Sequence, residues 1–145
     1  MSTWVAFLRG HAALTRELNA QLVARHGLTL NDYEVLLHLS QAPDQRMRRV
    51  DLAQTVVLTQ SGITRLLEGL ERADLVERAE CPSDRRVAYA VLTDAGLERL
   101  REAAATHVDG VHELFADRFS DDELDTLGVL LGRFGGGDAE SCSPD

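Results

Sequence analysis

Residues 50–73 constrain the fold more than any other part of the sequence, because they predict two short helices with only a brief connection between them. In the first, VDLAQTVV, Leu52, Ala53 and Val56 recur at helical spacing and predict one buried face. The second begins at Thr59, a preferred N-cap residue. Its apolar residues fall on one side: Ile63, Leu66, Leu67 and Leu70. Two short helices joined in this way are typical of a helix-turn-helix motif.

The opposite side of the second helix is polar. It carries two hydroxyls, an amide and a guanidinium before its first acidic residue, Glu68: Gln60, Ser61, Thr64 and Arg65. Gly62 leaves room for another backbone to approach. These groups are suited to hydrogen bonding with base edges, where a bidentate arginine–guanine or glutamine–adenine pair gives about 1–3 kcal/mol of discrimination. The pattern therefore predicts a DNA-reading surface, with a merely solvated helix face as the alternative.

A hairpin is predicted over about residues 75–92, where LVERAE and RVAYAVLT flank the turn CPSD. Arg85 and Arg86 would stand at its tip. A hairpin beside a helix in the major groove brings its tip near the duplex backbone, where an arginine can enter a narrow minor groove. Asp84 would accept a hydrogen bond from Arg85 or Arg86 and fix the direction of that guanidinium. An exposed turn with solvated charges is the alternative.

Four further helices surround these elements. Apolar residues at three- and four-residue steps predict a helix over 3–25 that ends at Gly27, and a second helix runs from the N-cap Thr29 to about residues 40–42. MRRV is a candidate short strand. Thr93 caps a long helix to about Arg118, and Ser120 with Glu123 forms a capping box for the last one. The predicted fold class is mostly α with a small β-hairpin, a winged helix-turn-helix.

The terminal helices carry more apolar residues on one side than the core of one small domain needs, and their outer faces are acidic. They are read either as ordinary core or as a dimer interface in which N- and C-terminal helices interlock. A two-fold dimer would present two recognition helices to DNA half-sites about one helical turn apart. The final residues, 138–145, are polar and predict a disordered tail.

The net charge of -9 counts against a nucleic-acid partner, but the acidic residues are unevenly distributed along the chain. Residues 46–86 hold 8 arginines against 7 acidic residues, whereas the rest of the chain holds 7 against 17. Binding depends on the local field, so the central lobe stays available for DNA. The total acidity keeps one alternative open, a winged-helix protein–protein interaction module without DNA binding.

The sequence supports no enzyme, cofactor or metal site, because neither its carboxylates nor its five histidines show a catalytic or metal-ligand spacing. Cys81 and Cys142 do not form a disulfide framework. Cys81 is a candidate thiol sensor if Arg85 and Arg86 lower its pKa, and otherwise an ordinary exposed cysteine. With neither a signal peptide nor a membrane span in the sequence, we expect a cytoplasmic protein.

The stretch LTQSGITRLLEGLERADLVERAECPSDRRVAYAVLTDAG, residues 58–96, resembles the central signature of the MarR family of bacterial transcription regulators. The shared features are the hydroxyl-rich helix start, Thr-Arg-Leu, the strand entry LVER, Asp-Arg-Arg at the wing, and LT-x-x-G before the next helix. Asp74 stands where the family usually has glycine. Because Asp tolerates a positive φ, we expect the turn to survive.

The resemblance implies a homodimer that binds a palindromic operator, usually as a repressor of a nearby operon that a small aromatic or lipophilic effector relieves. It implies a single domain over 1–137, with dimerisation helices at 1–28 and 97–137 and a DNA-binding lobe at 29–96. The implied DNA contacts are Thr59, Gln60, Ser61, Thr64 and Arg65, then Arg85 with Asp84 as its brace, and Arg86. The family's peroxide sensors carry a cysteine in the first helix, where this chain has none. Candidate effector contacts are His11, Tyr33 and His38.

Overall fold

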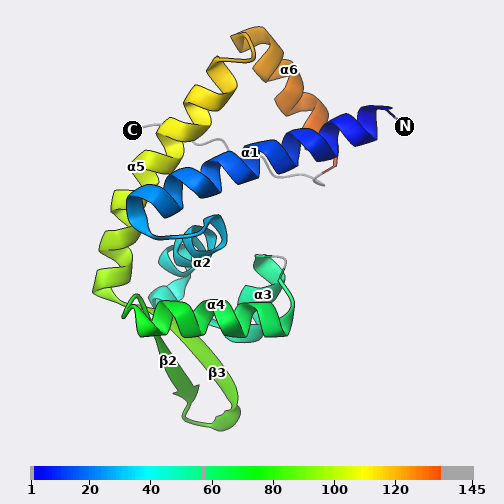
Figure 1. Cartoon of the computed structure of the whole chain (residues 1–145). Coiled ribbons are helices and arrows are strands. Elements are labelled where there is room, and N and C mark those ends of the chain that lie inside the picture. The colour runs from blue at the N-terminus through cyan, green and yellow to red at the C-terminus, as the bar shows by residue number, and fades with distance from the viewer. Residues whose placement is uncertain (1, 57, 135–145) are drawn as a thin grey trace. The chain divides into compact units, whose positions relative to one another are not determined.

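The computed structural model describes residues 2–56 and 58–134, and its backbone forms two compact bodies, one through Asp109 and one from Gly110 onward. The first body holds α1 to α4, the sheet and most of α5; the second holds the end of α5 and α6 (Figure 1). The predicted fold class is confirmed: the chain is mostly helical, with one small antiparallel sheet. The predicted disordered tail lies outside the described residues.

Local signals place the first two helices where the sequence predicts them. Helix α1 (Ser2–His26) ends at Gly27, whose φ of 66° is accessible to glycine at little cost. Helix α2 (Leu30–Gln41) begins with a complete capping box: the Thr29 hydroxyl accepts from the Asp32 amide, and the Asp32 carboxylate accepts from the Thr29 amide. The predicted apolar side of α1 is buried only at Leu18 and Leu22.

The helix-turn-helix consists of α3 (Arg49–Thr55) and α4 (Gln60–Arg72), which pack against each other. The predicted start of α4 is confirmed. Helix α3 ends two residues earlier than the predicted VDLAQTVV segment, at a C-cap formed by Val56. The segment before α3 forms a 3-10 turn, η1 (Pro43–Gln45), and then a short strand, β1 (Arg46–Arg48). The strand shares only Met47 and Arg48 with the predicted MRRV segment, whose last two residues begin α3.

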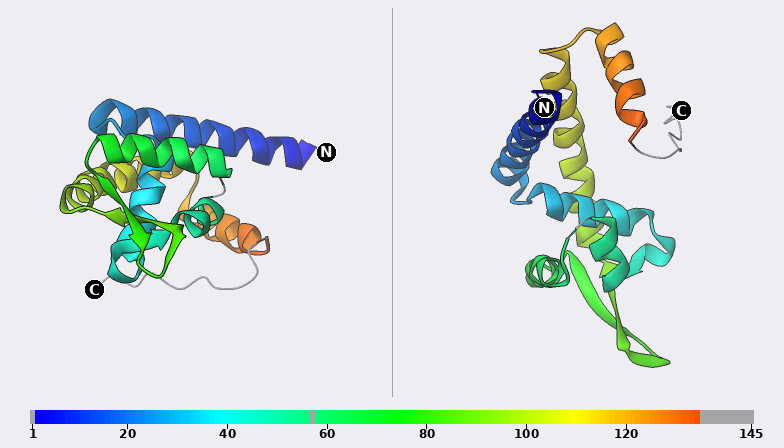
Figure 2. Two further views of the ribbon diagram at one scale, coloured as in Figure 1. Left: turned by 90° about the horizontal axis from the view of Figure 1, so that it is seen from below. Right: turned by 90° about the vertical axis from the view of Figure 1, so that its right-hand side faces the viewer.

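The wing consists of β2 (Val76–Cys81) and β3 (Asp84–Leu92), and it projects beyond the helices in Figure 1 and in the right-hand view of Figure 2. Strand β3 lies in the centre of the sheet, with β1 antiparallel on one side and β2 antiparallel on the other. The hairpin is therefore part of a three-stranded sheet, and β1 ties the wing to the start of α3.

Two helices complete the chain. Helix α5 (Asp94–Ala116) begins after Thr93, whose hydroxyl accepts from the Gly96 amide at 2.9 Å. Helix α6 (Asp121–Gly132) begins with the predicted capping box of Ser120 and Glu123. None of the helices within residues 2–56 and 58–134 combines the length and apolar character that a bilayer span requires.

One apolar core in the first body holds the helix-turn-helix and the base of the wing together. Its largest fully buried side chains come from α1, α2, α3, α4 and β2: Leu22, Val35, Leu36, Leu39, Leu52, Ile63, Leu67 and Val76. At about 1.5–3 kcal/mol for each such buried side chain, this cluster dominates the stability of the body. It fixes the orientation of α4 and leaves the polar face of that helix outside.

Candidate nucleic-acid interface

The first turn of α4 is built around its N-cap. The Thr59 hydroxyl accepts from the Gly62 amide at 3.1 Å and lies 3.2 Å from the Ser61 hydroxyl. Thr64 donates to the Gln60 carbonyl at 2.8 Å. These bonds order the start of the helix before any ligand arrives. They still leave hydroxyl lone pairs and the rotatable hydroxyl of Ser61 for further hydrogen bonds.

The predicted polar face of α4 is exposed as expected. Ile63, Leu67 and Leu70 are buried, whereas the side chains of the candidate site lie at the surface: Thr59, Gln60, Ser61, Thr64 and Arg65. No acidic residue occupies the first turn of the helix. Gly62 has a local role, because a Cβ there would lie 3.1 Å from the Thr59 hydroxyl. The glycine thus preserves the N-cap that orders this surface.

At the wing tip, Pro82 and Ser83 form the turn and Asp84 begins β3. The Asp84 carboxylate accepts from the Arg86 backbone amide at 3.0 Å and from Arg86 Nε at 3.2 Å. These two hydrogen bonds lower the pKa of Asp84. The assignment of Asp84 as the brace of Arg85 is therefore wrong: the carboxylate folds back onto its second neighbour, as Asp side chains do in turns.

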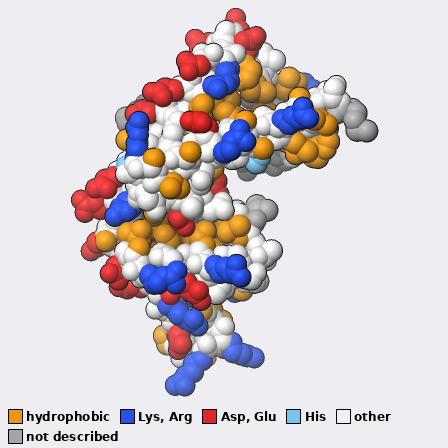
Figure 3. Space-filling view, viewed as in Figure 1, with side chains coloured by type: hydrophobic (Ala, Val, Ile, Leu, Met, Phe, Trp, Pro, Cys, Tyr) orange, Lys and Arg blue, Asp and Glu red, His pale blue; other side chains and the backbone are white. Residues whose placement is uncertain are grey.

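Both wing arginines point into solvent. Arg86 keeps 91% of its side chain exposed although it pairs with Asp84. Arg85 is exposed as well, and basic side chains gather at the wing end of the surface in Figure 3. An exposed ion pair adds little to stability, so the Asp84–Arg86 contact mainly sets a direction for the guanidinium.

Cys81 lies beside this turn, with its sulfur 3.2 Å from the Ser83 hydroxyl. Its thiol pKa is lowered, first by the Ser83 hydroxyl and then by backbone groups of Ser83 and Asp84. The two arginines that the sequence suggested as the cause make no such contribution. Hydroxyl and backbone groups of the turn, and not the arginines, therefore account for the lowered pKa of Cys81.

Two arginines that the sequence reasoning missed border α4. Arg49, at the start of α3, pairs with Glu71 in the last turns of α4 at 3.6 Å, and both side chains are largely buried. Together with Arg78 of β2 they line a cavity of about 340 Å³ beside Gln60 and Thr64. Both lie in the arginine-rich stretch, but no local pattern shows which arginines there turn toward α4.

The structure places the three candidate effector residues in different surroundings. His11 is exposed on α1, and its carbonyl accepts from Thr15. Tyr33 is buried against the His107 ring, with 4.6 Å between ring centroids, and burial raises its phenol pKa. His38 lines a separate cavity of about 460 Å³. Within residues 2–56 and 58–134, no group of three His, Cys, Asp or Glu side chains is placed to hold a metal ion.

A helix-turn-helix with an exposed polar second helix and a β-wing beside it defines a winged helix-turn-helix protein. A sequence profile described as MarR family matches residues 26–87. The chain belongs to the MarR family of transcriptional regulators, and it is not an enzyme.

Solved structures support this membership. AbsC, a MarR family transcriptional regulator from Streptomyces coelicolor, is 37% identical, with a TM-score of 0.81 over 92% of this chain and 90% of its own. Sco3205 from the same organism, solved in complex with DNA, is 30% identical, with a TM-score of 0.82 over 98% and 91%. The transcriptional repressor YetL of Bacillus subtilis is 31% identical over 75% of this chain and 65% of its own.

Proposed function

We propose that this regulator binds a palindromic operator as a homodimer, with α4 in the major groove and the wing reaching the adjacent minor groove. The observation that carries the proposal is the exposed, acid-free first turn of α4 beside an arginine-tipped wing. Sco3205 was solved with DNA and shares almost the whole length of this chain, which supports a DNA-binding role.

In the major groove, Gln60 and Arg65 are the base-reading candidates on α4, because amide and guanidinium groups pair bidentately with adenine and guanine. Thr59, Ser61 and Thr64 offer hydroxyls to phosphates or bases. Helix α4 is fixed from behind by buried leucines and by the Arg49–Glu71 pair. A rigid platform lowers the ordering cost of binding.

At the wing, Arg85 is the minor-groove candidate and Arg86 the phosphate neighbour. Arg85 has no ion pair with a described residue, so its guanidinium is available to DNA. The Arg86 guanidinium is held by the Asp84 carboxylate. The two arginines thus differ: one is free to enter a narrow groove, and the other is held at a set angle.

The dimer is supported by apolar surface on the terminal helices. In α1, Trp4, Phe7 and Leu8 are exposed, and in α6, Val129 and Leu130 are exposed. Exposed apolar patches of this kind mark interaction surfaces. A two-fold partner that covers them would pair two recognition helices for the two halves of a palindrome.

We propose repression of a nearby operon in the cytoplasm, relieved by a small aromatic or lipophilic effector. The similarity to YetL, which is named a repressor, supports the direction of regulation. The effector would prefer a dimer whose recognition helices are wrongly spaced. A coupling free energy of about 2 kcal/mol is enough to change operator affinity by tens-fold.

The test is binding of the full-length protein to a palindrome from its own promoter region, titrated with salt. We expect specific binding with a steep salt dependence. Arg65→Ala should weaken it by about 1–3 kcal/mol and relax base preference, and Arg85→Ala should reduce the salt slope by about 1. Arg25→Ala removes the same charge from an exposed site near the end of α1, outside the proposed DNA interface, and the variant should keep its operator affinity while it remains a dimer.

Sequence-independent binding that neither Arg65→Ala nor Arg85→Ala alters would contradict the proposal. It would favour the alternative of a protein–protein module. Circular dichroism and size-exclusion chromatography on each variant establish that fold and oligomeric state are retained.

A further inference from the structure

One acidic side chain lies on the face of α4 that carries the base-reading candidates. Glu68 is exposed, and it follows Thr64 by four residues and Arg65 by three. Residues at these separations are neighbours on one helix surface. At a rise of ~1.5 Å per residue, Glu68 lies about 12 Å along the helix axis from Gln60, in the third turn. It therefore continues the row of candidate DNA contacts, although the proposed function does not use it.

A shared hollow links Glu68 to two of those contacts. It lines the cavity of about 340 Å³ beside α4 together with Gln60 and Thr64. A helix that lies along a major groove about 12 Å wide can present its third turn to base edges as well as its first. A stretch of DNA that meets Gln60 and Thr64 would therefore also meet the Glu68 carboxylate.

The other charged groups of this hollow balance the charge of Glu68. Arg49 and Glu71 line it and pair with each other at 3.6 Å. Arg78 of β2 lines it as well and has no ion pair with a described residue. Two arginines thus face two glutamates, and the hollow has no net negative charge. Because DNA binding depends on the local field, a duplex can approach Glu68 here.

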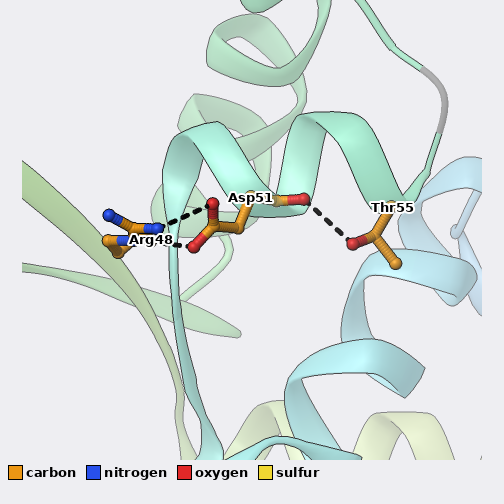
Figure 4. A network of polar contacts seen from close by, with 3 residues as sticks. All are labelled: Arg48, Asp51 and Thr55. Carbon is orange, nitrogen blue, oxygen red and sulfur yellow. Dashed lines mark hydrogen bonds and ion pairs between the residues drawn. The ribbon is translucent and has the colours of Figure 1, made fainter.

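Two neighbouring arginines are spaced to pair with Glu68, but neither forms an ion pair with it in the part of the chain that the structure describes. Arg65 precedes it by three residues, and Arg72 follows it by four. At the start of α3, Arg48 and Asp51 have the same order and separation as the first of these pairs and do form a bidentate pair, at 2.7 and 3.1 Å (Figure 4). Asp51 is thus engaged within the protein, whereas the Glu68 carboxylate keeps its acceptor positions for a ligand.

The base that suits a carboxylate in the major groove follows from its chemistry, because an ionised carboxylate accepts hydrogen bonds and donates none. Cytosine presents a donor there, its N4 amino group. Guanine presents the acceptors N7 and O6, and thymine presents an acceptor and a methyl group. Adenine places the acceptor N7 beside its N6 donor. Cytosine is therefore the base that offers a donor without an adjacent acceptor to repel the carboxylate.

We propose that Glu68 reads a cytosine in each half of the operator by accepting a hydrogen bond from the N4 amino group. The inference rests on the proposed operator-binding function, and it adds a selectivity that Gln60 and Arg65 do not supply, since their side chains favour adenine and guanine. Phosphates repel the carboxylate on every sequence, and the bond to cytosine offsets this repulsion only at the matching base. Glu68 thus acts mainly by rejecting other sequences.

Selection of bound sequences from a pool of random DNA duplexes, with the full-length protein, tests this assignment. The wild-type consensus should contain a cytosine at one position of each half-site, and replacing that base pair should weaken wild-type binding about tenfold. Glu68→Gln preserves the size of the side chain but presents an amide, which pairs with adenine. The selected base at this position should therefore change from cytosine to adenine. Glu68→Ala should select no base there.

Glu98→Gln is the matched control, because it removes the same charge from an exposed site on α5, outside α4 and the wing, and should select the wild-type consensus. A consensus that Glu68→Gln leaves unchanged would overturn the proposal, since the carboxylate would then act on phosphates alone. Equal loss of binding to all duplexes by both Glu68 variants would also overturn it and assign Glu68 to supporting the helix. In either case the operator-binding function stands. If the wild-type protein selects no consensus, that function fails, and the assignment of Glu68 fails with it.

Discussion

The wing differs sharply between its tip and its root. At the tip, Arg86 is 91% exposed and is held by one carboxylate. At the root, Leu75, Val76 and Leu92 are buried, and the Thr93 hydroxyl donates to the Asp74 carbonyl at 2.7 Å. The tip carries charge with little packing, whereas the root carries packing with little charge.

This contrast separates two functions along one hairpin. Buried contacts at the root fix the angle at which the wing leaves the body, because a close-packed core resists displacement. Exposed side chains at the tip can adjust to a groove at low cost. Substitutions at the root should therefore reduce stability, and substitutions at the tip should alter DNA binding alone.

Gly96→Ala tests the root most severely. A Cβ at this position would lie 2.1 Å from the Leu75 carbonyl oxygen and 2.8 Å from a Leu92 methyl. Because the obstacle is backbone, the start of α5 would have to move, and we expect a loss of about 3 kcal/mol or more in the free energy of unfolding. Urea denaturation followed by circular dichroism measures it.

Gly69→Ala is the control for this substitution. The nearest atom to its added Cβ is an Arg72 guanidinium nitrogen at 3.9 Å, so the change should be neutral or stabilise α4 by up to about 1 kcal/mol. Equal effects of the two substitutions on the free energy of unfolding would show that helix propensity, and not the close approach to Leu75, determines the effect of Gly96→Ala.

Thr93→Val should have an intermediate effect at the same root. It removes the N-cap bond to Gly96 and the hydroxyl bond to the Asp74 carbonyl while nearly preserving side-chain volume. We expect a loss of about 1–2 kcal/mol, measured by the same denaturation. Thr93→Ser should retain most of the stability. If Thr93→Ser is as unstable as Thr93→Val, the methyl group and not the hydroxyl is responsible.

The root also shows which structural features can be predicted from the sequence alone. The cap at Thr93 and the positive φ of Asp74, observed at 58°, follow from residue types at fixed spacing. Such signals involve neighbours in sequence. For the same reason the N-cap at Thr29, the capping box at Ser120 and the buried face of α4 were predicted correctly.

Contacts between distant residues were not predictable in this way. The Arg49–Glu71 pair and the stacking of Arg46 on Tyr89 depend on tertiary packing, which determines which of several neighbouring arginines meets which partner. At the tip, the sequence suggested either arginine as the partner of Asp84, and the resemblance favoured Arg85. The turn geometry selects Arg86, because its amide and its Nε both reach the same oxygen.

Asp84→Asn should have the smallest effect on stability and tests the tip. The lowered pKa of Asp84 means that its ionised form is favoured in the folded protein. The Arg86 pair is therefore intact above the ordinary Asp pKa of 3.8 and is lost only as the pH falls through the lowered value. At neutral pH the substitution mimics that loss, and we expect no change in the unfolding midpoint.

DNA binding should respond to Asp84→Asn in two opposing ways. Loss of a negative charge near phosphates raises affinity for any sequence, whereas loss of the carboxylate that directs Arg86 lowers selectivity. We expect the ratio of operator to non-specific affinity to fall by about threefold, without a fall in non-specific affinity. Competition binding with a scrambled duplex measures this ratio. An equal loss on both duplexes would instead assign Asp84 to holding the wing fold, which would remove the distinction between tip and root.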